Sequence, residues 1–121
     1  MKNNLLRGNP FEPPAGRLAL YLHVPFCERK CPYCAFESYV PSGSDTDLWL
    51  DSLEKEIKWW NSRIGTPELS TCYIGGGTPT VLNAAQWQRL AGMIDRCFSF
   101  AADAEVSVEA NPNSLHAWHL Q

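Results

Sequence analysis

Apolar and more polar side chains alternate over residues 18–24, where the apolar set is Leu18, Leu20, Leu22 and Val24. A period of two predicts a β-strand that turns one face toward a core. A second strand is expected at residues 69–74, which lead into a run of glycines. A third is expected at residues 105–109, where Val106 and Val108 alternate with polar residues.

Between the first two strands the apolar residues recur at spacings of three and four, which predicts an amphipathic helix. This helix should begin at Ser44, with Asp47 in the capping-box position, and end at Gly65. Its apolar face is expected to consist of Trp49, Leu53, Ile57, Trp60 and Ile64.

A second helix is expected between the second and third strands. It should begin at Asn83, with Gln86 completing a capping box. Its buried side chains are expected to be Trp87, Leu90, Ile94, Cys97 and Phe98. After the third strand, Asn113 or Ser114 could cap the start of a third helix.

Strands that alternate with helices in this way indicate parallel strands joined by helical crossovers, so the expected fold class is α/β. Residues 1–17 are rich in proline and glycine and should form a leader, while residues 18–121 should form one core domain. A closed barrel of strand–helix units needs roughly 200 residues. About three units therefore predict an incomplete domain, either part of a longer protein or a protomer completed by other segments.

Composition and charge narrow the functional classes. The chain has 121 residues, of which 45% are hydrophobic and 19% charged, and its net charge is −3. Ten basic residues without a dense cluster argue against a nucleic-acid partner. The sequence predicts neither an export signal nor a membrane span, so we expect a cytoplasmic protein. In a reducing cytosol, five cysteines favour metal binding over disulfides.

Three of these cysteines, Cys27, Cys31 and Cys34, have the spacing CxxxCxxC directly after the first strand. Thiolates ligate iron–sulfur clusters, and three of them would leave one iron of a 4Fe-4S cubane open. A structural zinc site with His23 as fourth ligand is the alternative, because CxxC is also a zinc spacing. Three aromatic residues are expected to shield the thiols from solvent, namely Phe26, Tyr33 and Phe36.

Two further sequences fall at the ends of the other strands, where parallel α/β sheets collect their ligands. The glycines Gly75–Gly77 are either a simple turn or a place where backbone N–H and C=O groups reach a ligand. Glu109 should lie on the sheet face opposite Val106 and Val108. Tyr21 should point the same way from the first strand. An inward carboxylate at Glu109 would need a cationic partner.

The remaining conspicuous residues are expected to be structural. Cys72 and Cys97 are interpreted as buried thiols, and His116 and His119 as a solvated pair. The tryptophans are expected to pack in the core or between helix and sheet, and they are Trp49, Trp59, Trp60, Trp87 and Trp118.

Three motifs together resemble the radical S-adenosylmethionine (SAM) superfamily: YLHVPFC with its CxxxCxxC loop, YIGGGTPT at residues 73–80 and VEANP at residues 108–112. The resemblance implies the N-terminal part of a partial (β/α) barrel of the TIM type. It further implies that a 4Fe-4S cluster is ligated by Cys27, Cys31 and Cys34. Residues matching contacts to the SAM on the open iron are Tyr21, Gly76 and Glu109. Gly77 and Thr78 match contacts to a second SAM in the decarboxylating enzymes.

Within the superfamily, the motifs are most similar to the branch of coproporphyrinogen III dehydrogenases and haem chaperones. Phe36 stands where the decarboxylating oxidase has a fourth cysteine, so we favour the haem-chaperone pattern, with the oxidase as alternative. The resemblance implies haem or porphyrin as partner, with haem bound only by a full-length protein. It also implies a haem-accepting respiratory protein and an electron donor such as flavodoxin or ferredoxin, and it leaves weak membrane association open. Activity of the isolated 121-residue chain is not expected.

Overall fold

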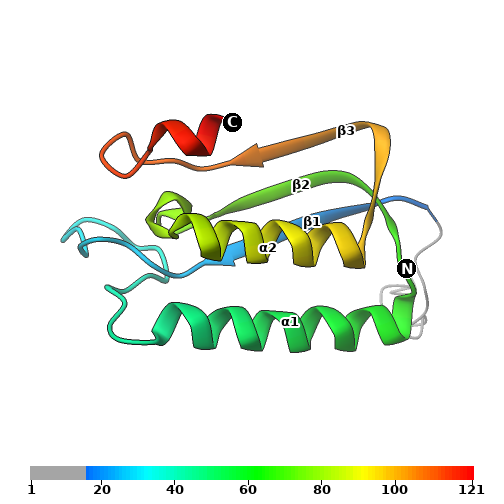
Figure 1. The fold of residues 1–121 in the computed structure, drawn as a ribbon, viewed down its shortest axis with the longest axis horizontal. Helices are drawn as coiled ribbons and strands as arrows, with labels where there is room; N and C mark the ends of the chain where they lie inside the picture. The colour runs from blue at the N-terminus through cyan, green and yellow to red at the C-terminus, as the bar shows by residue number, and fades with distance from the viewer. Residues whose placement is uncertain (1–15) are drawn as a thin grey trace, which may run out of the picture.

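In the computed structural model of the chain, residues 16–121 are described, so the predicted leader lies almost entirely outside the described residues. The sheet has three strands in the order β1-β2-β3: β1 (Leu18–Val24), β2 (Glu68–Gly76) and β3 (Ser99–Val108). Both strand pairs are parallel. Helix α1 (Asp45–Ile64) connects β1 to β2, and helix α2 (Ala84–Cys97) connects β2 to β3 (Figure 1). The α/β prediction is therefore confirmed.

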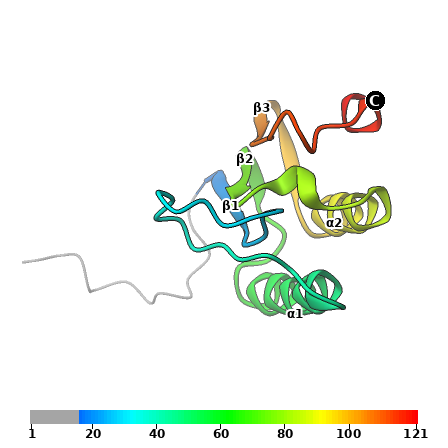
Figure 2. The ribbon, with the colours of Figure 1, turned by 90° about the vertical axis from the view of Figure 1, so that its left-hand side faces the viewer.

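The two helices cover one face of the sheet, and no helix or strand of residues 16–121 covers the other face, which we call the open face (Figure 2). Alternation along β1 explains this arrangement, because Leu22 and Val24 are buried while Tyr21, next to Leu22, is exposed. The core lies between sheet and helices and consists of Leu22, Val24, Phe26, Leu50, Leu69, Cys72, Ile74, Leu82, Leu90 and Ile94.

Helix α1 ends before Gly65 as predicted, but its first turn differs from the prediction. Ser44 precedes the helix and makes no capping hydrogen bond with its side chain. The carboxylate of Asp45 instead accepts hydrogen bonds from the backbone N–H and the hydroxyl of Ser42. The face of the helix is also slightly rotated, since the fully buried residue is Leu50, which the expected apolar set omitted.

Helix α2 begins with the predicted capping box. The side chain of Asn83 accepts a hydrogen bond from the backbone N–H of Gln86, and the side chain of Gln86 accepts one from the N–H of Asn83. Leu90 and Ile94 are buried as predicted, and Met93 joins them. Both prediction and structure follow from local sequence, because the two side chains satisfy N–H groups that a helix start leaves without partners.

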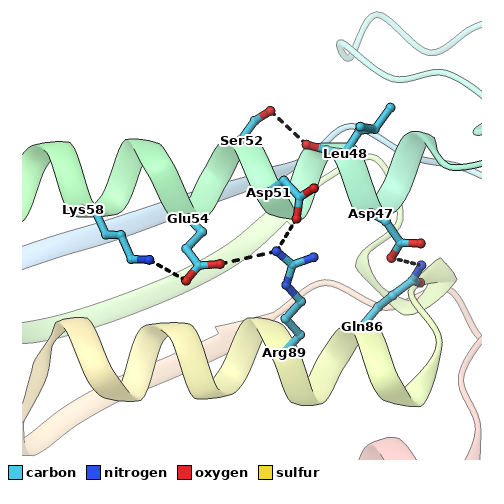
Figure 3. Close-up of polar contacts among 8 residues, drawn as sticks. All are labelled: Asp47, Leu48, Asp51, Ser52, Glu54, Lys58, Gln86 and Arg89. Atoms are coloured by element: carbon cyan, nitrogen blue, oxygen red, sulfur yellow. Dashed lines mark hydrogen bonds and ion pairs between the residues drawn. The ribbon is translucent and has the colours of Figure 1, made fainter.

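Polar side chains join the two helices along their exposed edges (Figure 3). Arg89 of α2 forms ion pairs with Asp51 and Glu54 of α1. Lys58 pairs with Glu54 one turn further along α1. These exposed contacts link α1 to α2 beside the apolar core that both helices share.

Strand β3 is longer than predicted, beginning at Ser99. Val106 and Val108 pair in register with Cys72 and Ile74, so they point to the helix-covered side, but both remain exposed because α2 lies mainly over β2. The prediction of a third helix that begins at Asn113 or Ser114 is wrong. The segment contains a 3₁₀ turn, η3 (Ala117–Leu120), and the Asn111 side chain accepts a hydrogen bond from the N–H of Asn113 in the turn before it.

The expectation that the other cysteines, the histidines and the tryptophans are structural is confirmed only in part. Trp49 and Trp87 pack against the core, and Cys72 is buried, as predicted. Cys97 is half-buried. His116 is exposed, whereas His119 is half-buried with its ring stacked on that of Trp118 at a centroid distance of 3.6 Å. Three of the tryptophans, which were expected to pack in the core or between helix and sheet, are exposed, namely Trp59, Trp60 and Trp118.

Candidate cofactor site at the strand ends

The three conspicuous sequences meet at the C-terminal ends of the strands. A cavity of about 650 Å³ lies between the cysteine loop, the end of β2 and the segment after β3. Its lining includes seven of the eight candidate residues: Cys27, Cys31, Cys34, Gly76, Gly77, Thr78 and Glu109. Tyr21 is the exception, because it lies on the open face further down β1. The cavity has the size of a site for a small molecule or cofactor.

The cysteine loop, residues 27–39, is closed at its base. The N–H of Cys27 donates to the carbonyl of Tyr39 at 3.0 Å, and the N–H of Tyr39 donates to the carbonyl of Pro25 at 2.9 Å. Phe26 and Tyr39 form a parallel bridge at the same point. Within the loop, the N–H of Cys34 donates to the carbonyl of Cys31, so the CxxC segment is a tight turn.

All three thiols are free and partly exposed, so they can reach a bound group in the cavity. The hydroxyl of Thr78 donates a hydrogen bond to the Cys27 sulfur over 3.4 Å. Residues 16–121 contain no group of three or more His, Cys, Asp or Glu side chains gathered around a single metal ion. Each cysteine of a cubane binds a different iron, so ligands of a cluster need not converge on one point. Three thiols on one cavity therefore fit a cluster.

The aromatic residues around the thiols differ from the expectation. Phe26 is buried in the core, where it packs edge-on against Tyr39 and Trp49. Tyr33 and Phe36 line the cavity but are 88% and 62% exposed. A hydrogen bond with the side chain of Cys31 raises the pKa of Tyr33. The aromatic residues thus do not form the closed shield that the sequence suggested.

His23, the fourth ligand in the zinc alternative, is engaged elsewhere. Its Nδ1 lies 2.9 Å from the hydroxyl of Tyr21, and its Nε2 lies 2.7 Å from the carbonyl oxygen of Glu37. Both ring nitrogens are therefore occupied, and His23 fastens β1 to the end of the cysteine loop. The arrangement gives the zinc alternative no imidazole ligand from His23.

The glycines pack closely against neighbouring segments, and Gly76 and Gly77 also line the cavity. The N–H of Gly77 donates to the carbonyl of Val24, and that of Thr78 donates to the carbonyl of Phe26. A Cβ at Gly77 would lie 2.5 Å from the Phe26 carbonyl oxygen. Gly76 has a φ of +108°, and a Cβ there would lie 2.6 Å from the His23 ring. The glycine run thus extends the β1–β2 pairing to the base of the cysteine loop.

Glu109 directly follows β3 and contacts Tyr73 on the open face, as the alternation predicts. Its Oε1 accepts a hydrogen bond from the hydroxyl of Tyr73 at 2.7 Å, and its Oε2 accepts one from the N–H of Gly76 at 3.1 Å. Both donors are neutral, so the expected cationic partner is not found within residues 16–121. The hydrogen bond with Glu109 raises the pKa of Tyr73.

Two further groups of residues at the site were missed by the sequence argument. Tyr73 could have been found, because alternation along β2 places it on the same face as Tyr21 of β1. The buried pair Thr80 and Ser114, whose hydroxyls lie 2.7 Å apart, could not. Thr80 also accepts a hydrogen bond from the N–H of Asn111, so the pair holds the segment after Glu109 against the end of β2.

Comparison with known proteins gives a consistent result. The model of the radical SAM superfamily matches residues 21–118. The haem chaperone HemW of Bacillus subtilis is 42% identical over 102 residues, which make up 84% of this chain and 27% of that protein. HemW of Mycobacterium tuberculosis is 41% identical over 104 residues, with the same two shares. The oxygen-independent coproporphyrinogen III oxidase of Escherichia coli is 39% identical over 103 residues, 84% of this chain and 22% of that protein.

A solved structure agrees with these relatives. The coproporphyrinogen III oxidase HemN from Escherichia coli, described as a radical SAM enzyme, superposes with a TM-score of 0.75 at 38% identity. The match covers 84% of this chain and 24% of that one. The chain thus spans about a quarter of the length of these relatives. Within residues 16–121, no helix combines the length and apolarity needed to cross a membrane.

Proposed function

The chain belongs to the radical SAM superfamily, and from this premise we propose that it carries the cluster-binding part of a haem chaperone of the HemW type. Membership implies a 4Fe-4S cluster and SAM as cofactors. The observation that carries the proposal is the shared cavity, where three free thiols face the end of the glycine run and the Glu109 carboxylate.

The residues that would hold the two cofactors come from different elements. Cys27, Cys31 and Cys34 would ligate the cluster, and Thr78 would donate its hydroxyl hydrogen to the sulfur of Cys27. Such hydrogen bonds to ligand sulfur raise the reduction potential of a cluster by stabilising its more negative, reduced state. Glu109 would hold the SAM through hydrogen bonds or charge, with Gly76 beside it.

The chemistry that the cofactors supply when bound is electron transfer from the reduced cluster to SAM, which yields a 5′-deoxyadenosyl radical. The chain contributes orientation: the closed base of the cysteine loop fixes the direction of the first thiol, and the Cys31–Cys34 turn keeps the other two together. Tyr21 would contribute from the open face, through its hydrogen bond to His23 and its stacking on Tyr73.

The choice within the branch rests on one position at the cavity. Phe36 lines it where the decarboxylating oxidase carries a fourth cysteine, and this supports a haem-binding chaperone that delivers haem to a respiratory acceptor. The oxidase is the second candidate, because the solved oxidase superposes over most of the chain. Haem binding, the respiratory acceptor and a flavodoxin- or ferredoxin-type electron donor all belong to the proposal.

The test is anaerobic reconstitution of the chain with iron and sulfide, followed by electron paramagnetic resonance of the reduced protein. We expect about four irons and four sulfides per chain for a cubane, and a change in the resonance when SAM is added, since SAM would bind the open iron. Zinc without iron in anaerobically purified protein, or a spectrum that SAM leaves unchanged, would overturn the proposal. In a full-length form with its cluster, haem binding without decarboxylation of coproporphyrinogen III separates the chaperone from the oxidase.

A further inference from the structure

Tyr73 occupies a central position on the open face of the sheet. It lies in β2 between Tyr21 of β1 and Ser107 of β3, its partners in the parallel register. Its ring stacks on that of Tyr21 at a centroid distance of 6.0 Å and an interplanar angle of 27°. Its hydroxyl reaches toward the strand ends and donates to Glu109 Oε1. The ring is thus held from one side, and its hydroxyl contacts Glu109, which lines the cofactor cavity.

Gly75 makes room for this contact. It is the next residue of β2 on the same face, so a side chain there would lie between the phenol and the carboxylate. A Cβ at Gly75 would come within 2.7 Å of Tyr73 Cε1 and 2.9 Å of both the carboxyl carbon and Oε2 of Glu109. Approaches below 3.0 Å essentially do not occur for real Cβ atoms. The first glycine of the run therefore has a specific steric role at this site.

The carboxylate is oriented by two donors but not neutralised by them. Tyr73 and the N–H of Gly76 each occupy one oxygen, and both donors are uncharged. An ionised carboxylate has about four lone-pair directions, so the remaining two stay available to a ligand. Because Glu109 lines the cofactor cavity, its free lone pairs and full negative charge suit an ammonium or hydroxyl group of a bound nucleotide.

We propose that Tyr73 is a positioning residue that, together with the gap at Gly75, sets the direction in which the Glu109 carboxylate meets its ligand. This inference rests on the proposed function, since the ligand is taken to be SAM. It adds a residue whose hydroxyl would act on the ligand through Glu109. Substituting the phenol should therefore weaken binding only while the carboxylate is present.

The test is a double-mutant cycle on the whole chain with its cluster, using Tyr73→Phe, Glu109→Gln and the double variant. Tyr73→Phe keeps the stacked ring and removes only the donor. We expect about tenfold weaker SAM binding in equilibrium dialysis, because a hydrogen bond to a charged group is lost. In the Glu109→Gln background the same change should have little further effect. Tyr39→Phe is the matched control, since it removes a phenol hydroxyl but keeps the backbone hydrogen bonds of the loop base and the ring that packs on Phe26.

Tyrosine titration by ultraviolet absorbance provides a readout that needs neither cluster nor SAM. In the Glu109→Gln variant, the tyrosine with the raised pKa should ionise at lower pH than in the wild-type chain. In the Tyr73→Phe variant, the ionisation of this tyrosine should be missing. If Tyr73→Phe bound SAM as tightly as the wild-type chain, the inference would be overturned and the proposed function would stand. The same holds if Tyr73→Phe weakened SAM binding equally with and without the Glu109 carboxylate. A wild-type chain that forms no cluster or binds no SAM would overturn both the inference and the proposed function.

Discussion

The two faces of the sheet are organised by different forces, although they share every strand. The covered face packs apolar side chains such as Leu22, Val24 and Ile74 against two helices. These side chains are held by burial and not by hydrogen bonds. The open face carries Tyr21, Tyr73 and other polar groups, which are held by hydrogen bonds and ring stacking while they remain in contact with solvent.

This difference separates stability from chemistry. Burial of apolar surface is non-directional and roughly proportional to area, so the covered face can hold the fold without fixing any one atom. A cofactor needs atoms in fixed directions, and hydrogen bonds supply them. The comparison implies that substitutions on the covered face should change the free energy of unfolding, whereas substitutions at the open face and strand ends should change cofactor binding.

Cysteine substitutions should give the largest contrast, because the same residue type occurs in both regions. Cys31→Ala is expected to abolish the 4Fe-4S cluster, measured as iron and sulfide content after anaerobic reconstitution, with little change in unfolding of the cluster-free chain. Cys72→Ala, at a buried position, should keep the cluster and lower the unfolding free energy by about 1 kcal/mol. Full iron content in the Cys31 variant would contradict the ligand assignment.

Neighbouring residues of β1 give the next contrast. Leu22→Ala removes a buried side chain and should lower the free energy of unfolding by about 2–5 kcal/mol, through lost burial and a residual cavity. Tyr21→Ala removes a side chain that is 55% exposed, and its lost stacking should lower that free energy by only about 1 kcal/mol. Urea unfolding of both variants measures the difference. Equal losses would show that the open face contributes to stability as much as the core.

The smallest effect is expected at the helix edges, in the pH dependence of stability. Hydrogen bonds with Lys58 and then Arg89 lower the pKa of Glu54 below its ordinary value of 4.5. A carboxyl with a lowered pKa stabilises the fold above pH 4.5, and this contribution disappears as the pH falls through the folded-state pKa. Glu54→Gln should therefore be slightly less stable at pH 7 and should lose less stability on acidification.

Unfolding midpoints at pH 7 and at pH 3 measure this change, with Glu56→Gln as the control on the same helix. A Glu54 variant that lost as much stability on acidification as the wild-type chain would rule out the ion pairs as the cause. The effect should also shrink in high salt, because exposed ion pairs are screened.

Much of the covered face could be predicted from the sequence, because periodicity reports which side chains avoid water. The bounds of β1 were predicted correctly for this reason, and the capping box of α2 was predicted from the local pair Asn83 and Gln86. The predicted cap at Ser44 is wrong because residues 42–45 form a turn before the helix. Hydrogen bonds between Ser42 and both the backbone N–H and the carboxylate of Asp45 close this turn. The third helix failed because the Asn111 turn and the buried Thr80–Ser114 contact fix the chain in another conformation.

The candidate site was predictable in location but not in its internal contacts. Spacing and topology placed the cysteines, the glycines and Glu109 at one edge of the sheet, and the structure places them on one cavity. The role of each glycine depended on atoms from distant segments, such as the carbonyl of Phe26 beside Gly77. Donor–acceptor pairs like Tyr73 and Glu109, separated by 36 positions, leave no periodic signal in the sequence.

The closed base of the cysteine loop has a consequence for how this region can vary. Because the backbone leaves and returns at the Phe26–Tyr39 bridge, the segment between them is a self-contained insert on the sheet. Lengthening its tip would change the entropy of closing the loop only slowly with length and would leave the bridge in place. The cysteine loop can thus change in length without changing the spacing of the strands that carry it.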